Sequence, residues 1–127
     1  MRKPPPEPRC WAYTLPGGWE VLAGKTDADN DLLSLRYAHP NDWWFHVHGM
    51  PGSHVLLRWR EDAEPDREAL RAAAAIAAWH SKARTAGVVA VLCTRAKFIS
   101  KPRGAEPGSV CSKRDEVLKV RPGLPGE

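Results

Sequence analysis

The sequence predicts an α+β fold in a single domain, a mostly antiparallel sheet of about five to seven strands with one long and one short helix. Three observations favour this class. A chain of 127 residues is long enough to bury one hydrophobic core but not two independent ones. Several short runs alternate apolar and polar residues, which is typical of half-buried strands. One stretch, DREALRAAAAIAAWHSKAR, has helical periodicity instead.

The chain is expected to begin with a disordered segment, a hairpin and a short helix. Residues 1–10, MRKPPPEPRC, should be disordered, because proline lacks a backbone donor and favours polyproline II. Pro16-Gly17-Gly18 then offers a turn between two strands, the second over residues 20–24. The short helix has its N-cap candidates at residues 27–30, and Pro40 must end it.

Two further strands are predicted over residues 43–48 and 55–60, and their register depends on the loop between them. With a four-residue loop, His54 lies opposite Val47, on the other face of the sheet from His46. With a five-residue loop, His48 faces His54, and this register is favoured because one face then collects the apolar side chains of Trp43, Phe45, Val47, Val55, Leu57 and Trp59. The opposite, exposed face then carries Trp44, His46, His48, His54, Arg58 and Arg60.

The long helix is expected from Asp66 to Arg84, with acidic residues in its first turn, basic residues in its last and Gly87 beyond it. Its alanine-rich stripe should face the core, because small side chains allow close approach to a sheet. A central buried strand follows at residues 88–94.

The chain is expected to end with a hairpin over residues 109–113 and 117–121 that turns at Arg114-Asp115. The folded domain then spans residues 11–121. Residues 122–127 should form a frayed tail.

Positive charge is concentrated toward the C-terminus. Residues 1–80 hold 9 Lys and Arg against 11 Asp and Glu, a net charge of −2, whereas residues 81–127 hold 10 against 4, a net charge of +6. Clustered cations gain affinity for nucleic acid by releasing its counterions. The gradient favours a phosphate-rich partner, although a solvated basic face explains it equally well.

Membrane and disulfide-rich classes are disfavoured. No apolar run reaches the length of about 18 residues that a membrane helix needs, and the proline-rich N-terminus does not resemble a signal peptide. Cys10, Cys93 and Cys111 are far apart and form no CxxC motif, which argues against a disulfide framework or a cysteine zinc site. We therefore expect a cytoplasmic protein with reduced thiols and no membrane partner.

The histidines of the segment HVHGMPGSH allow a metal-site hypothesis. His46 and His48 are two apart on a predicted strand and share a face, which His54 joins only in the favoured register. No carboxylate or cysteine has useful spacing and no HExxH motif is present, so no metal or other cofactor is expected. Ser53 beside His54 lacks an orienting acid and is a poor catalytic pair. Structural roles for His46 and His54 remain as open as contact with a ligand.

A second basic cluster lies in RAKFISKPRGAEPGSV, where glycines allow close approach of a ligand. The absence of GxxxxGK[ST] and GxGxxG motifs excludes a mononucleotide loop. Lys82 and Arg84 either join this cluster or serve the helix dipole. Together with the exposed face of the central hairpin, the predicted nucleic-acid-binding residues are Trp44, His46, His54, Arg58, Lys82, Arg84, Arg95, Lys97, Lys101 and Arg103.

Three segments, NDWWFHVHGMPGSHVLLR, AAAAIAAWHSKAR and KPRGAEPGSV, resemble the RNA-binding domain of NFACT proteins in order and spacing. The resemblance implies an α+β domain that binds RNA and has no catalytic activity of its own. His48 departs from the family pattern. The residues that match it are Asn30, Asp31, Asn41, Asp42, Trp44, Phe45, His46, Pro51, Gly52, Ser53, His54, Ser81, Lys82, Arg84, Lys101, Pro102, Gly104, Pro107 and Gly108.

The resemblance also implies a cellular setting. NFACT proteins include factors that add C-terminal tails in ribosome quality control, and full-length members carry further domains. We therefore expect a stand-alone module for tRNA or rRNA, linked to translation, ribosome quality control or tRNA modification, with the ribosome or a tRNA-modifying enzyme as its partner. Two alternatives stay open: a metal-dependent or RNA-modifying enzyme using His46, His48 and His54, and a protein-interaction adaptor using the PPPEP segment.

Overall fold

An antiparallel sheet of six strands forms the centre of the molecule, in a computed structural model that describes residues 7–126. The strand order is β1-β2-β4-β3-β5-β8, and a second, two-stranded sheet pairs β6 with β7. The strands are β1 (Cys10–Thr14), β2 (Glu20–Gly24), β3 (Trp43–Val47), β4 (Val55–Leu57), β5 (Val89–Arg95), β6 (Ile99–Ser100), β7 (Cys111–Ser112) and β8 (Glu116–Val120). The helices are α1 (Asp27–Leu32), the π-helix η1 (Leu33–Tyr37), α2 (Arg67–Trp79) and the 3-10 helix η2 (Ala96–Phe98). The predicted α+β class is confirmed.

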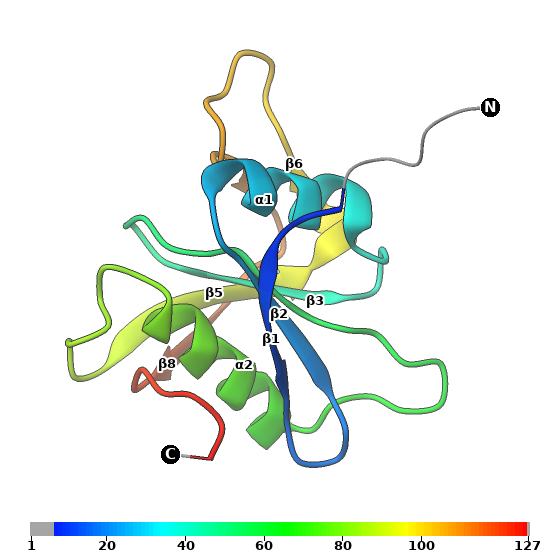
Figure 1. Cartoon of the computed structure of the whole chain (residues 1–127), viewed down its shortest axis with the longest axis vertical. Coiled ribbons are helices and arrows are strands. Elements are labelled where there is room, and N and C mark those ends of the chain that lie inside the picture. The colour runs from blue at the N-terminus through cyan, green and yellow to red at the C-terminus, as the bar shows by residue number, and fades with distance from the viewer. Residues whose placement is uncertain (1–6, 127) are drawn as a thin grey trace.

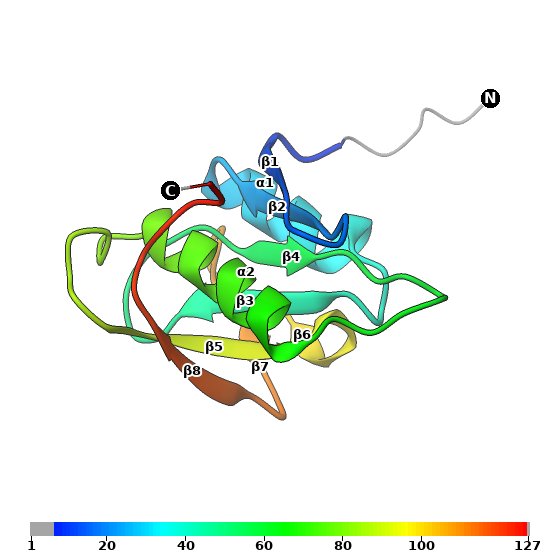
Figure 2. The same ribbon diagram turned by 90° about the horizontal axis from the view of Figure 1, so that it is seen from below.

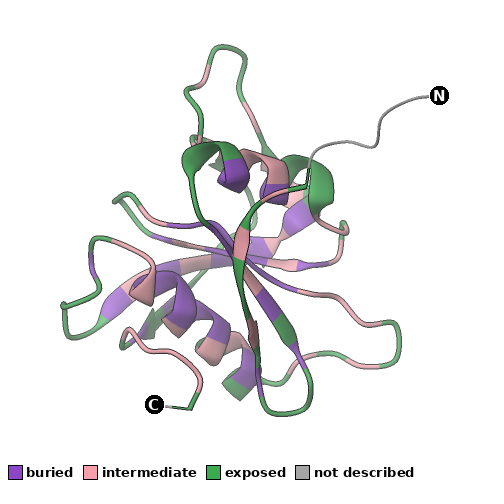
Figure 3. Cartoon of the chain, in the orientation of Figure 1, coloured by how far each residue is buried: buried purple, intermediate pink, exposed green. Residues whose placement is uncertain are grey.

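Helices cover both faces of the large sheet (Figures 1 and 2). On one face α2 packs over a main core that includes Phe45 and Ile76. On the other face α1 and η1 cover a smaller core of Leu33, Trp44 and Leu56. Buried residues accordingly line the strands and the side of α2 that faces them (Figure 3).

The opening hairpin is confirmed. Its register runs from Cys10↔Gly24 to Thr14↔Glu20, and Gly17 and Gly18 turn the chain with φ of 87° and 81°. Order starts earlier than expected, because Arg9 N donates to Asp29 Oδ1 at 2.9 Å and the Arg9 carbonyl accepts from Lys25 N. Residues 1–6, the larger part of the segment expected to be disordered, lie outside the described residues.

The N-cap of the short helix lies one residue before the predicted candidates. Thr26 is the N-cap, and its Oγ1 accepts from Asp29 N at 3.1 Å. The helix continues as η1, whose last turn closes through Ala38 N donating to the Leu33 carbonyl, and it ends before Pro40 as expected.

The long helix ends at Trp79, five residues before the predicted end at Arg84. Asp66 caps its start by accepting from Ala69 N at 2.8 Å. Beyond Trp79, the chain leaves the helix because the backbone of residues 80–82 bonds to the loop at residues 51–53 instead. Lys82 and Arg84 therefore lie outside the helix, although Arg84 Nε still donates to the carbonyl of its last residue, Trp79, at 2.7 Å.

The central hairpin has the predicted faces but a different register. Trp44 lies opposite Leu56 and Phe45 opposite Val55, which continues to His46 opposite His54. The favoured pairing of His48 with His54 is wrong, because this register places His54 opposite His46 and makes the loop longer than five residues. His48 N donates to the Ala90 carbonyl of the neighbouring strand β5 at 2.9 Å. Since the shift is two residues, every side chain keeps its predicted face.

The predicted C-terminal hairpin is wrong. β8 pairs with β5, whereas β7 pairs with β6, and the chain turns between the two sheets at Arg114, which has φ of 57°. The apolar strand β5 needs a neighbour on each side, and β8 supplies the second one. The tail expected to fray also has contacts, since Leu124 packs against the main core and Gly123 N donates to the Ala75 carbonyl at 3.2 Å.

Within residues 7–126, no helix has the length and apolar character that crossing a membrane requires. The three cysteines are free thiols. Burial raises the pKa of Cys93 to about 12, with the nearby Glu116 carboxylate adding to the effect.

Candidate nucleic-acid interface

Segments far apart in the sequence meet at one end of the large sheet. Gly52 forms a β-bridge with Ser81, and Ser53 N donates to the His80 carbonyl at 2.9 Å. Ser53 Oγ also donates to the carbonyl of Gly24, at the end of β2, at 2.6 Å. Glycine is required at position 52, because a Cβ there would lie 2.8 Å from the Cβ of Ser81. The motifs GMPGSH and WHSKAR are therefore neighbours in space.

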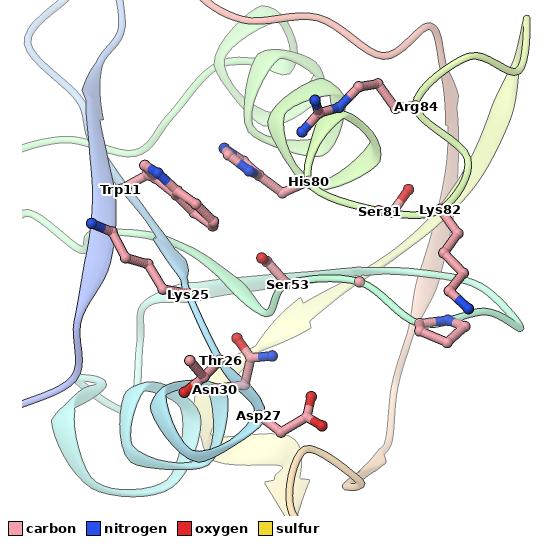
Figure 4. Close-up of a pocket in the computed structure, with 12 residues that line it drawn as sticks. Trp11, Lys25, Thr26, Asp27, Asn30, Ser53, His80, Ser81, Lys82 and Arg84 are labelled. Atoms are coloured by element: carbon pink, nitrogen blue, oxygen red, sulfur yellow. The ribbon is translucent and has the colours of Figure 1, made fainter.

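A surface hollow of about 340 Å³, which we call the cationic groove, opens at this meeting point. Figure 4 shows Trp11 and Lys25 on one side of it and Ser81, Lys82 and Arg84 on the other. Its lining residues are Trp11, Lys25, Thr26, Asp27, Asn30, Pro51, Gly52, Ser53, His80, Ser81, Lys82 and Arg84.

An aromatic stack forms one wall of the cationic groove. Trp11 is 40% exposed, and its ring lies nearly parallel to that of His80, with ring centroids 4.3 Å apart. His80 Nε2 shares a hydrogen bond of 2.6 Å with the Tyr13 hydroxyl. Burial lowers the pKa of His80 to about 4, and the Arg84 charge adds to the shift. At neutral pH the stack is thus uncharged and presents an aromatic face on which a base can stack.

Three cations line the same groove as this stack. Lys25 Nζ lies 5.5 Å from the centroid of the Trp11 ring. Arg84 packs over Trp79 and donates from Nε to its carbonyl at 2.7 Å, which fixes the direction of the guanidinium. Lys82 is exposed, and its ammonium has no hydrogen-bond or ion-pair partner among residues 7–126. The groove therefore combines ring stacking with positive charge, the two interactions that single-stranded nucleic acids use.

A second hollow of about 440 Å³, which we call the histidine pocket, adjoins the cationic groove. Asp27, Pro51 and Gly52 line both hollows. The remaining lining residues of the histidine pocket are Trp44, His46, Met50, His54, Leu92, Glu106, Pro107, Gly108, Ser109, Val110 and Ser112.

A chain of hydrogen bonds fixes the base of the histidine pocket. Trp44 Nε1 donates to Ser34 Oγ at 2.9 Å, and the Ser34 hydroxyl donates to His54 Nδ1 at 2.7 Å. Neutral His54 then carries its proton on Nε2, which donates to the Gly108 carbonyl at 3.0 Å. Both ring nitrogens of His54 are thus hydrogen-bonded within the protein.

The imidazoles here are uncharged at neutral pH. Burial lowers the pKa of His54 to about 4, and the neighbouring His46 contributes. Burial also lowers the pKa of His46, whose ring lies nearly parallel to Trp44 with centroids 5.9 Å apart. The expectation that this face is exposed is wrong: Trp44 is only 2% and His54 only 1% exposed, because α1 and η1 cover them.

The loop between β6 and β7 is bound to α1. Lys101 Nζ forms an ion pair with Asp31 at 3.1 Å and donates to the carbonyls of Glu106 and Ser109. Gly108 N donates to Asp31 Oδ1 at 3.1 Å. Lys101 therefore braces this loop, while Arg103 is exposed on it.

Three predicted residues lie at the opposite end of the sheet. Trp43 pairs with Arg95 there, whereas toward the other end of the same two strands His46 pairs with Leu92, and both line the histidine pocket. Arg95 lies 3.8 Å over the Trp43 ring and forms an ion pair with Glu64 at 3.0 Å. Lys97 follows Arg95 at this end, and Arg58 lies 3.5 Å from the buried carboxylate of Asp42. The structure thus divides the predicted residues among separate surfaces.

Trp11, Lys25 and His80 line the cationic groove but are not among the residues predicted from the sequence. Trp11 and Tyr13 alternate on an edge strand and Lys25 directly follows its partner strand, a pattern that allows an aromatic and basic surface. No local signal places His80 against Trp11, because that contact depends on where α2 ends.

The hypothesis of a three-histidine metal site has no support in the geometry. The described part of the chain, residues 7–126, contains no group of three or more His, Cys, Asp or Glu side chains that could hold a metal ion. His48 is exposed, and His54 has both ring nitrogens bonded to the protein.

Comparison with known families agrees with this architecture. The family described as the NFACT protein RNA binding domain matches residues 10–114. The chain belongs to this family. The resemblance seen in the sequence motifs is thereby confirmed.

Relatives of this NFACT RNA-binding domain are larger proteins. The chain is 36% identical over 121 residues to the Rqc2 homolog RqcH of Bacillus subtilis (strain 168) and 37% identical over 102 residues to that of Streptococcus suis (strain 05ZYH33). These alignments cover 95% and 80% of the chain but 21% and 18% of the relatives, so it spans about one fifth of their length. A solved structure of the C-terminal part of the fibronectin/fibrinogen-binding protein from Streptococcus suis superposes with a TM-score of 0.83 at 33% identity, covering 97% of this chain and 49% of that one.

Proposed function

We propose that this domain binds RNA through the cationic groove and acts as a binding module rather than as an enzyme. The observation that carries the proposal is one hollow that combines the exposed Trp11–His80 stack with Lys25, Lys82 and Arg84. Stacking of a base on an aromatic side chain is worth about 1–3 kcal/mol, and each cation that contacts a phosphate releases counterions. Membership of the NFACT RNA-binding family supports the same conclusion.

The relatives support a role in ribosome quality control, because they are named Rqc2 homologs. The proposed ligand is accordingly tRNA or rRNA, the proposed partner is the ribosome and the proposed location is the cytoplasm. These relatives give no support to a tRNA-modifying enzyme as the partner. The contacts with RNA predicted for Trp44, His46, His54, Arg58, Arg95, Lys97, Lys101 and Arg103 remain predictions.

Salt dependence of binding tests the position of the site. Replacing Lys82 and Arg84 together by alanine is expected to weaken binding of a fluorescein-labelled single-stranded RNA. The slope of log affinity against log salt should flatten by about 1.4, since each lost phosphate contact on a single strand accounts for about 0.7. Fluorescence anisotropy titrations between about 50 and 200 mM salt measure this slope.

A matched control is available on the opposite edge of the sheet. Lys119→Ala with Arg121→Ala removes the same two charges from exposed positions on β8 and just after it. This pair should leave the slope nearly unchanged. Equal losses in both double variants would contradict the groove as the site, and failure of the unmodified domain to bind RNA would contradict the function.

A further inference from the structure

The cationic groove and the histidine pocket share a border but differ in charge. Asp27, Pro51 and Gly52 line both hollows. Lys25, Lys82 and Arg84 line the groove, whereas among the described residues the histidine pocket has no Lys or Arg in its lining. Its charged side chains are the carboxylates of Asp27 and Glu106. A phosphate is therefore favoured in the groove and repelled from the pocket.

The histidine pocket has the chemistry of a site for a neutral aromatic heterocycle. Its volume of about 440 Å³ lies within the range of about 300–1,000 Å³ that small-molecule sites occupy. The half-buried His46 ring and the partly buried side chains of Leu92 and Val110 provide ring and apolar contacts. Glu106 and Ser112 line the same pocket and can accept hydrogen bonds from the amino groups of a nucleobase.

Asp27 lies where the two hollows meet, and its carboxylate makes no hydrogen bond or ion pair with any other residue in the described range 7–126. A carboxylate at a border between a phosphate site and a base site is placed to accept a hydrogen bond from a ribose hydroxyl. The 2′-hydroxyl is the group that separates RNA from DNA in such contacts.

We infer that the histidine pocket takes the base of one unpaired nucleotide of the bound RNA, with its ribose against Asp27 and its neighbouring phosphates in the cationic groove. This inference rests on the proposed function and narrows the ligand from RNA in general to RNA with an unpaired nucleotide. A base within a duplex is stacked and paired, so it reaches such a pocket only at the cost of opening the helix.

Three fluorescein-labelled probes of one sequence test the ligand class: single-stranded RNA, single-stranded DNA and blunt-ended duplex RNA. Single-stranded RNA is expected to bind about tenfold more tightly than the duplex and several-fold more tightly than the DNA, a tenfold ratio being about 1.4 kcal/mol. Asp27→Ala should bring the RNA and DNA affinities close together, because the acceptor is lost. Asp27→Asn keeps an acceptor oxygen and should retain the difference.

A pocket-filling variant tests the base site separately. Ser109 is exposed and lines the histidine pocket, so Ser109→Trp is expected to reduce affinity for single-stranded RNA about tenfold by occupying the space of the base. Thr14→Trp adds the same ring at an exposed position that lines neither hollow and should have little effect.

The outcomes separate this inference from the function on which it rests. Equal affinity for the three probes, or equal effects of Ser109→Trp and Thr14→Trp, overturns the base pocket. If the base pocket is overturned but the slope of log affinity against log salt still depends on Lys82 and Arg84, RNA binding through the groove alone is upheld.

Discussion

His54 connects three segments of the chain through one side chain and one backbone amide. Its Nδ1 accepts from Ser34, its Nε2 donates to Gly108, and its backbone N–H donates to Asn30 Oδ1 at 3.0 Å. A protonated ring would carry a hydrogen on Nδ1 and could no longer accept from Ser34. Burial and this bonding pattern both favour the neutral imidazole, in agreement with the lowered pKa of about 4.

The stability of the domain should therefore decrease as the pH falls. The folded pKa of His54, about 4, lies below its ordinary value of 6.5, so the unfolded chain takes up the proton first. The stabilisation is complete above pH 6.5 and is lost progressively toward pH 4. At about 1.4 kcal/mol for each pKa unit, protonation of His54 should lower the free energy of unfolding by roughly 3 kcal/mol over this pH range. Urea unfolding at a series of pH values measures this dependence.

Two substitutions assign that dependence to its source. His54→Gln should be less stable at neutral pH, because Ser34 loses its acceptor, but its stability should vary less with pH. His48→Gln, at an exposed histidine on the same segment, should change neither property. An unaltered pH dependence in His54→Gln would refute the assignment.

Among the elements, the loop between β6 and β7 depends most on individual contacts. It has no regular structure between Lys101 and Val110, and Asp31 and His54 hold it against α1. Gly108 lies at this attachment with φ of 85° and close to Asp27, where a Cβ would approach Oδ1 to 2.8 Å. The close approach of Gly108 to Asp27 therefore determines how near the loop lies to the histidine pocket.

Alanine substitutions at two glycines of this loop separate the cost of backbone strain from the cost of a steric clash with Asp27. Gly104→Ala should cost about 1 kcal/mol, because φ is 79° but nothing lies within 4 Å of the new methyl group. Gly108→Ala should cost about 1–2 kcal/mol more, since it also displaces Asp27. Urea unfolding measures both costs, and faster amide hydrogen exchange over residues 101–110 should appear with Gly108→Ala. Similar costs at the two positions would show that the contact with Asp27 is unimportant.

Features set by neighbouring residues were predictable from the sequence, and features set by distant contacts were not. The turn at Pro16-Gly17-Gly18 and the faces of β3 and β4 follow from local rules of turn chemistry and strand alternation. The burial of Trp44 under α1 and η1 does not follow from local rules. A strand with alternating side chains has the same sequence pattern whether its second face contacts water or a helix. The pairing of β8 with β5 and the end of α2 likewise depend on long-range bonds.

The candidate site likewise contains some residues that the sequence predicted and others that only the fold brings together. The cluster of basic residues identified Lys82 and Arg84, and the family motifs identified the loop at Gly52. Trp11 and Lys25 belong to an edge hairpin, and only the folded chain brings them to the other residues of the groove.

At the scale of the whole molecule, the two ends of the large sheet differ in how their cations are used. At the groove, Lys82 has no hydrogen-bond or ion-pair partner within the described chain. At the far end, Arg95 pairs with Glu64 and Lys97 donates to Asn41 Oδ1 at 3.3 Å. RNA bound at the far end would have to compete with these internal partners.

Replacing Arg95 and Lys97 together by alanine should therefore flatten the salt slope less than replacing Lys82 and Arg84. The two double variants remove equal charge, so a general loss of positive potential would affect them equally. The same anisotropy titrations compare them, and a larger effect of the Arg95 and Lys97 pair would move the main site to the far end.

The bridge between Gly52 and Ser81 also couples recognition to folding. The walls of the groove come from segments as far apart in the sequence as Trp11 and Arg84, and they exist only when this bridge and the sheet have formed. A ligand that binds only the native state raises its population by mass action, by about 2.7 kcal/mol at a free concentration one hundred times Kd. RNA would thus act on this small domain as a folding ligand, and its free concentration would set how far the folding equilibrium lies toward the native state.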